Sequence, residues 1–194
     1  MNKSRLEAFS DGVFAIIITI MVLELKIPET TGWDVLTRLA PVFFCYLLSF
    51  AFVGVYWVNH HHLLHTVKKV NASILWANLH LLFWLSLIPF ATGWMGQNCL
   101  GKNPVAVYGG LLALCGIAYT ALSYAIRKTH VHETDLTRAI DKSDLKGRVS
   151  LALYGISIPM ALFVNTYVSE GLFVVVAVMW MIPSKAIEAA LGND

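Results

Sequence analysis

Four long stretches of this chain contain no Asp, Glu, Lys or Arg, and they constrain the fold more than any other feature. They cover residues 39–67, 70–101, 103–126 and 149–169. A helix needs about 20 apolar residues to cross the roughly 30 Å hydrocarbon core of a bilayer, and each stretch meets that length. Open sheet edges cannot face lipid, so helices are the economical way to span it. The chain is therefore predicted to be an all-α integral membrane protein.

Two weaker apolar segments extend this pattern to six helices. One lies between Asp11 and Glu24, and the other covers 171–184 and continues beyond Pro183. The predicted helices span about 6–27, 40–62, 72–95, 104–126, 148–167 and 170–189, in a single domain over 1–194. The mixed-charge segment 127–147 is predicted to be a cytoplasmic loop with some helix. We expect the first segment to be a mature helix and not a signal peptide, because acidic residues interrupt it and no small-x-small cleavage site precedes Glu24.

The composition excludes several other classes of protein. Hydrophobic residues make up 57% of the chain and charged residues 13%, with a mean hydropathy of +0.66. Such a chain is too apolar for a soluble domain or for a disordered one. Three cysteines without a CxxC pair do not form a disulfide framework. A net charge of +2 predicts no nucleic-acid partner.

The distribution of Lys and Arg predicts the orientation in the membrane. With six spans, eleven of these residues lie on the side of the N-terminus and three on the opposite side. Cytoplasmic loops carry the excess of positive charge, so both termini are predicted to be cytoplasmic.

The first helix carries two carboxylates too close together to lie both outside the membrane. Asp11 and Glu24 are 13 residues apart, about 20 Å along a helix, against about 30 Å of hydrocarbon. Each residue of a helix is turned by about 100° from the one before, so a largely apolar set of side chains lies along one line of this helix. Its members are Arg5, Phe9, Gly12, Ile16 and Leu23, with Thr19 and Ile20 flanking them. Asp11 lies about 140° from that line, which favours its burial against protein partners.

Polar residues of the second and third helices reach the same depth as Asp11. A buried carboxylate needs hydrogen-bond donors, so we expect a polar network at the cytoplasmic side. Its candidate members are Arg5, Ser10, Asp11, Trp57, His60, His61, Asn78 and His80. Such a network either locks the helices together or takes a direct part in ion entry or proton sensing.

The segment RLEAFSD at Arg5–Asp11, followed by GVFAIIITIMVLEL, resembles the RxxxFSD signature of the transmembrane protein 175 family. Arg5, Phe9, Ser10 and Asp11 all match the signature. The pattern of Tyr56, Trp57, His60 and His61 is similar to the second helix of that family, which contains endosomal/lysosomal potassium channels and prokaryotic relatives. Length and helix number resemble a prokaryotic member with one repeat.

This resemblance implies a moderately potassium-selective, leak-type channel that assembles as a homotetramer around its first helix, in the cell membrane of a prokaryote. It implies a pore without a re-entrant selectivity loop, and the sequence contains no TVGYG-like stretch. By position, Ile16 is expected to form the narrowest hydrophobic constriction, followed by Ile20 and Leu23. Thr19 matches the threonine associated with selectivity. Glu24 lies near the outer mouth, where it either concentrates cations or pairs with Lys26. No cofactor is expected beyond the permeant K⁺.

Other functions remain open from the sequence. A proton-permeable channel is the nearest alternative, because the histidines can bind protons near neutral pH. A secondary transporter of an unknown substrate is a second alternative, since Pro89 and Pro159 can break helices, but no charged residue accompanies them. His61 and His65 have the spacing of metal ligands on a helix. No repeated histidine box or acidic motif accompanies that pair, so neither a metal site nor an enzyme is expected.

Overall fold

The computed structural model describes residues 2–28, 31–129 and 134–181, without the side chains of 134–144. Every regular element in these ranges is a helix. The elements are α1 (Lys3–Leu23), α2 (Asp34–His65), α3 (Ala72–Ser86), α4 (Ile88–Gln97), α5 (Lys102–Arg127), α6 (Thr134–Pro159), the π-helix η1 (Met160–Val164) and α7 (Thr166–Met181).

Five helical segments of the described chain are long and apolar enough to cross a membrane, with α3 and α4 counted as one segment. The sixth, α7, is a shorter apolar helix whose described part ends at Met181. The predicted all-α membrane fold is confirmed. Residues 182–189 of the last predicted helix lie outside the described residues.

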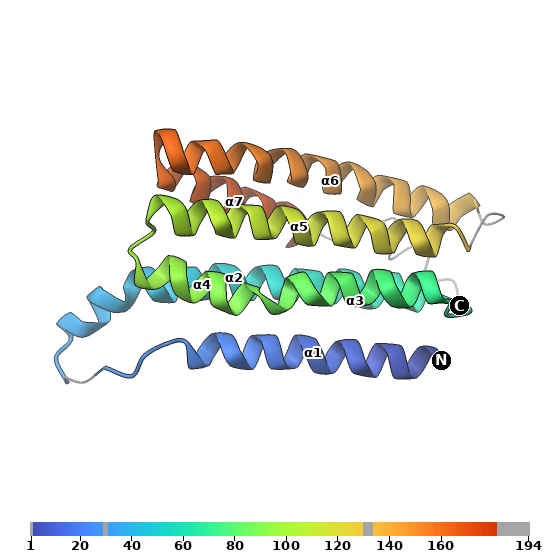
Figure 1. Ribbon diagram of the computed structural model, residues 1–194, viewed down its shortest axis with the longest axis horizontal. Helices are drawn as coiled ribbons and strands as arrows, with labels where there is room; N and C mark the ends of the chain where they lie inside the picture. The colour runs from blue at the N-terminus through green and yellow to red at the C-terminus, as the bar shows by residue number, and fades with distance from the viewer. Residues whose placement is uncertain (1, 29–30, 130–133, 182–194) are drawn as a thin grey trace.

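Three boundaries differ from the prediction. The first helix ends at Leu23 and not near 27, because Pro28 disfavours the helical conformation of the residue before it. The second helix begins at Asp34, and its 32 residues reach about 48 Å, so its first turns extend past the neighbouring helices (Figure 1). Segment 127–147 is not one loop, since α6 already begins at Thr134. α6 runs without a break from Thr134 into the apolar stretch that begins at Val149, so the helix of this membrane span extends back into the polar segment.

The helical segments run antiparallel, side by side, and α1 lies at one edge of the bundle (Figure 1). α1 contacts α2, α3 and α4, whereas α5 lies between the α3–α4 segment and the α6–α7 pair. The α6–α7 connection is at the end of the bundle opposite to the N-terminus. One edge helix therefore keeps a whole face free of contacts with the other described helices.

Two prolines coincide with breaks in the helices. Pro89 follows the interruption at Leu87, and Pro159 immediately precedes η1. Proline supplies no backbone N–H and disrupts the hydrogen-bond ladder of the preceding turn. After η1, Asn165 adopts an extended conformation, and its side chain accepts a hydrogen bond from the Tyr167 backbone N–H at 2.8 Å. This turn brings α7 back against α2, α5 and α6.

Aromatic and leucine side chains fill the centre of the bundle around α5. Tyr108 is fully buried, and its ring meets that of Phe173 at a centroid distance of 5.4 Å. The neighbouring Gly109 lets α6 and α7 approach closely: a Cβ there would lie 2.7 Å from Ser157 Oγ and 3.1 Å from the Phe173 ring. A glycine at this position is required by packing.

Candidate functional site

The face of α1 predicted to line a pore is exposed on the single chain. We call this face the α1 stripe, and it consists of Phe9, Gly12, Ile16, Thr19, Ile20 and Leu23. The exposed fraction is 59% for Ile16 and 75% for Leu23. A Cβ added at Gly12 would meet no atom within 4 Å. A set of bulky apolar side chains with a hydroxyl among them is therefore available to another copy, to lipid or to water.

The opposite face of α1 fixes the direction in which the stripe points. Its buried residues recur every three or four positions, the period of one helix face. They are Leu6, Ser10, Phe14, Ile17 and Met21. Burial of this set against α2, α3 and α4 turns the α1 stripe outward.

A buried polar chain joins three helices behind the stripe. His60 Nε2 of α2 donates to Asn78 Oδ1 of α3 at 2.7 Å, because an amide oxygen can only accept. Asn78 Nδ2 donates to Ser10 Oγ at 3.0 Å, and the Ser10 hydroxyl donates to the Leu6 carbonyl at 2.9 Å. These bonds hold α1 in one rotational position, because a different rotation would leave buried donors without acceptors.

Asp11 differs from the prediction. It is exposed on the single chain and accepts a hydrogen bond at 2.9 Å from Trp57 Nε1 of α2. Asp11 is not buried within the single chain, because Ser10 takes the position on the packed face and Asp11 is turned about 100° away from it. The predicted donor Trp57 is nevertheless its partner.

The remaining predicted polar residues do not join one continuous network. Arg5 is exposed at the start of α1. The His61 ring lies near the rings of Trp57 and His65 in tilted arrangements, with centroid distances of 6.2 and 6.3 Å. His80 accepts a hydrogen bond from Trp84 on its own helix at 2.8 Å. The polar residues therefore form separate groups around the base of α1.

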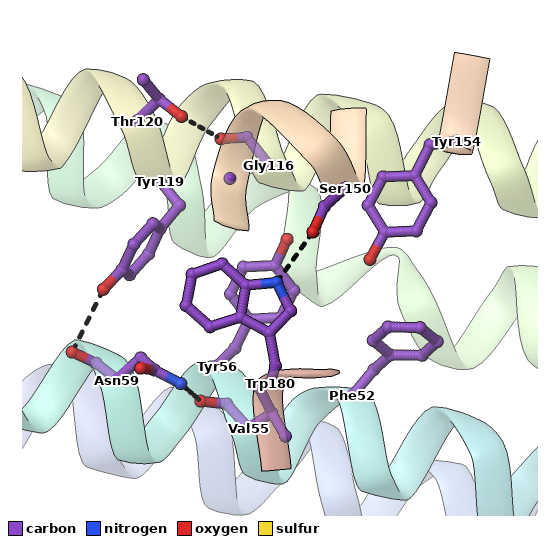
Figure 2. A pocket seen from close by; sticks show the side chains of 11 residues that line it. Phe52, Val55, Tyr56, Asn59, Gly116, Tyr119, Thr120, Ser150, Tyr154 and Trp180 are labelled. Atoms are coloured by element: carbon purple, nitrogen blue, oxygen red, sulfur yellow. Dashed lines mark hydrogen bonds between the residues drawn. The ribbon is translucent and has the colours of Figure 1, made fainter. Parts of the chain in front are cut away.

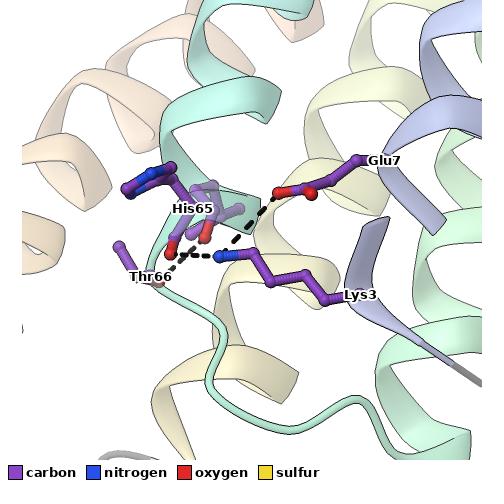
Figure 3. Close-up of polar contacts among 5 residues, drawn as sticks. Lys3, Glu7, His65 and Thr66 are labelled. Carbon is purple, nitrogen blue, oxygen red and sulfur yellow. Dashed lines mark hydrogen bonds and ion pairs between the residues drawn. The ribbon is translucent and has the colours of Figure 1, made fainter. Parts of the chain in front are cut away.

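Lys3 joins α1 to α2, a role that was not predicted from the sequence. Its Nζ donates to the His65 carbonyl at 2.6 Å and lies 3.8 Å from Glu7 Oε1 (Figure 3). The Lys3–Glu7 spacing of four residues was a usable signal, since such pairs face one another on a helix. The contact satisfies a terminal carbonyl of α2 and ties the N-terminus of α1 to it.

Thr19 has a defined hydroxyl orientation within the α1 stripe. Its Oγ1 donates to the Ala15 carbonyl of the preceding turn at 2.8 Å. The hydroxyl hydrogen is thereby used, and the remaining lone pairs of the oxygen can accept or coordinate. Thr19 thus offers an oxygen ligand about 4.5 Å further along the helix axis than Ile16.

Glu24 follows α1 and turns toward α4. A Cβ at Gly93 would lie 2.9 Å from Glu24 Oε2, so the carboxylate packs over a glycine that leaves it room. The ion pairs found among the described residues join Lys3 to Glu7 and Arg38 to Asp34, without Lys26.

The cavity of about 30 Å³ in Figure 2 lies away from the α1 stripe. Its walls come from α2, α5, α6 and α7, and five of the 11 lining residues are aromatic. Trp180 Nε1 donates to Ser150 Oγ at 2.8 Å, and the Tyr119 hydroxyl donates to the Asn59 carbonyl at 3.3 Å. Because α1 contributes no residue, this cavity is separate from the candidate pore-lining face. Within the described residues, no group of three or more His, Cys, Asp or Glu side chains could hold a metal ion.

The chain is a multi-pass helical membrane protein. Its spans run antiparallel, and the exposed face of its edge helix carries both apolar and polar groups. A family model described as endosomal/lysosomal potassium channel TMEM175 matches residues 5–89. The chain belongs to the TMEM175 family, which is a family of channels and not an enzyme class.

Individual relatives extend the match over the whole chain. A potassium channel of Chryseobacterium sp. is 52% identical over 194 residues, covering all of both chains. The crystal structure of a lysosomal potassium-selective channel TMEM175 homolog from Chamaesiphon minutus has a TM-score of 0.78 and 28% identity, covering 93% of this chain and 96% of that one. The human endosomal/lysosomal proton channel TMEM175 is 33% identical over 103 residues, which are 47% of this chain and 20% of the human one. The family predicted from Arg5–Asp11 is confirmed.

Proposed function

We propose that four copies of this chain assemble around a central axis and conduct K⁺ across a prokaryotic cell membrane, with the α1 stripe as the pore lining and Ile16 as its narrowest ring. The printed names of the Chryseobacterium and Chamaesiphon relatives support potassium as the permeant ion. The stripe is the observation that carries the proposal: the helix is fixed from behind, and its free face combines bulky aliphatic side chains with Gly12 and Thr19.

Lipid is a poor partner for the exposed part of α1. Thr19 lies in the α1 stripe, and Asp11, about 140° from the line through Ile16, is exposed as well. Polar and ionisable groups of a membrane helix rarely face lipid. Facing other copies or a water-filled axis removes that cost. An assembly that places the stripe at its centre also gives Ile16 and Leu23 partners.

Hydrophobic gating follows from a ring of Ile16 side chains. A narrow apolar ring expels water and blocks ions, whereas a small widening or rotation wets it. Ile20 and Leu23 would form further rings at about 6 and 10.5 Å along the helix axis. Leak-type conduction results when the wet state is populated without a stimulus.

Moderate selectivity follows from incomplete dehydration of the ion. K⁺ holds its water less strongly than Na⁺, so it loses water at the ring more cheaply. The free lone pairs of Thr19 Oγ1 then offer replacement oxygens. Glu24 would raise the local cation concentration from the outer end of α1 through its charge.

The test is an ion-flux assay on the full chain in liposomes, with opposed K⁺ and Na⁺ gradients and a proton ionophore as control. A membrane potential that follows the K⁺ gradient supports the proposal. Flux of protons alone would overturn it in favour of a proton channel, the activity named for the human relative. If the wild-type protein passes no ion, the variant Ile16→Asn in the same assay decides: new K⁺ flux identifies a closed channel, and continued silence overturns the proposal.

A further inference from the structure

Glu170 of α7 is the one buried acidic residue among the side chains that the structure describes. It is 4% exposed, and neither carboxyl oxygen has a hydrogen-bond partner in the described part of the chain. All other acidic side chains described here are exposed or partly exposed. Buried polar groups normally find partners, so an unpartnered carboxyl group at this depth requires an explanation.

The groups around Glu170 cannot neutralise a negative charge. Its carboxyl lies close enough to the Cys45 thiol of α2 and the Tyr108 hydroxyl of α5 for its charge to act on both. From α6, Tyr154 contacts Phe173, which follows Glu170 by three residues on α7, with 6.4 Å between the ring centroids. η1 contributes no titratable residue. Cys45, Tyr108 and Tyr154 are weak acids that are neutral when protonated, so none of them supplies a positive charge.

The described interior also lacks the basic side chains that could neutralise a carboxylate. Of the residues that the structure describes, the buried set contains no Lys or Arg, and its one histidine is His60. His60 follows Cys45 on the same helix by 15 residues, about 22 Å. It therefore lies toward the other end of the bundle.

The hydroxyl groups of this region already have partners. Tyr108 and Ser49 share a hydrogen bond of 2.8 Å, and Thr92 donates to Ser49 at 2.7 Å. Ser169, next to Glu170, donates to the Ser157 carbonyl at 2.7 Å. None of these hydroxyl groups is hydrogen-bonded to Glu170, so an ionised Glu170 would be an uncompensated charge in an apolar interior.

We propose that Glu170 is a proton-binding site inside the bundle, distinct from the α1 stripe, and that its bound proton is what allows α7 to pack against α2 and α5. A neutral carboxylic acid is far less costly to bury than a carboxylate. Release of the proton places a charge between three helices and weakens their packing. The site therefore couples proton concentration to the position of α7.

Protons can exchange with this site from the predicted outer side. Glu170 is four residues beyond the start of α7, about 6 Å along the helix axis. The α6–α7 turn, with Asn165 and Tyr167 exposed, lies at the end of the bundle opposite to the N-terminus (Figure 1). The path from solution is one to two helical turns long.

Reaction with dicyclohexylcarbodiimide tests the proposal on the full chain in liposomes. The O–H of a protonated acid adds across one C=N bond of the reagent: the proton goes to nitrogen and the carboxyl oxygen to carbon. The product rearranges to a stable N-acylurea without a leaving group. Mass spectrometry is expected to find this adduct on Glu170, formed faster at about pH 5 than at about pH 9. Glu170→Gln must lose the adduct, whereas Asp34→Asn, an exposed acid at the same end of the bundle, must keep it.

An infrared measurement decides the question without a reagent. A protonated carboxylic acid has a carbonyl band that a carboxylate lacks. The expected result is such a band in the wild-type protein near neutral pH, absent from Glu170→Gln and present in Asp34→Asn. Identical carbonyl regions in wild type and Glu170→Gln would mean that Glu170 is ionised, and this result overturns the proposal whatever the labelling shows. Neither measurement depends on ion conduction.

Discussion

Trp57 donates its indole N–H to the Asp11 carboxylate across the α1–α2 contact, with 2.9 Å between Nε1 and Oδ1. Both side chains are exposed on the single chain, next to a helix whose other side is packed. The bond therefore lies at the edge of the packed interior, next to the surface of α1 that is available to another molecule. It links the signature at Arg5–Asp11 to the second motif of the sequence.

Removing this hydrogen bond is expected to weaken the assembly. Trp57→Phe deletes the donor and Asp11→Ala the acceptor, and each is expected to cost about 1 kcal/mol, because the pair is charged but exposed. The double variant should lose little more than either single one, since both remove the same bond. Thermal unfolding and the oligomer fraction on size exclusion measure these losses. Asp11→Asn is the control, because its amide oxygen still accepts from Trp57.

The outcome that contradicts this interpretation is a loss of conduction in Trp57→Phe or Asp11→Ala with unchanged unfolding and oligomer yield. Asp11 would then act on the ion directly, which is the second role that the sequence left open for the polar network.

Ser10 and Asp11 show how much of the candidate site can be predicted from the sequence. The helical period correctly separated the apolar line through Ile16 from the packed face, because one helix face must bury its residues and the other is free. The same period could not tell which of two adjacent polar residues points at α3. That choice depends on where Asn78 and His60 lie in space, and the sequence spacing does not contain this information.

Glu170 was overlooked for a related reason. Its position at the start of an apolar run was visible, but its burial depends on the turn after η1, which brings α7 against α2. The membrane class needed only local composition and was predicted correctly, and five of the six predicted spans are long and apolar enough to cross a membrane in the described part of the chain.

Ile16→Asn is expected to raise the leak current by about tenfold or more. The Asn side chain of each copy binds water at the ring, so the dry, non-conducting state is no longer favoured in free energy over the wet state. Liposome flux or single-channel recording measures the change. Val22→Asn is the matched control: Val22 is an exposed aliphatic residue of α1 turned about 120° away from Ile16. An equal increase in both variants would remove Ile16 from the constriction.

Thr19→Val is expected to lower the K⁺/Na⁺ permeability ratio by about fivefold, since the loss of one weak oxygen ligand corresponds to about 1 kcal/mol. Valine keeps the branched shape and removes the oxygen. Thr19→Ser retains the hydroxyl and should retain the ratio. Reversal potentials under mixed K⁺ and Na⁺ gradients report it. Unchanged reversal potentials in Thr19→Val would show that the hydroxyl serves only its bond to Ala15.

Ser10→Ala is expected to destabilise the fold by about 1–2 kcal/mol, at the upper end for polar contacts between membrane helices. The substitution leaves Asn78 Nδ2 without its acceptor in a buried position, where a missing bond is costly. Asn78→Leu removes the unpaired donor as well but leaves His60 without its acceptor, so it should be no more stable than Ser10→Ala. Ser4→Ala, on the exposed first turn of the same helix, is the control and should change stability by less than about 0.5 kcal/mol.

Equal unfolding temperatures for Ser10→Ala and Ser4→Ala would show that apolar packing alone holds α1 in its rotational position. The outward direction of Ile16 would then depend on the buried apolar residues of α1, which are Leu6, Phe14, Ile17 and Met21.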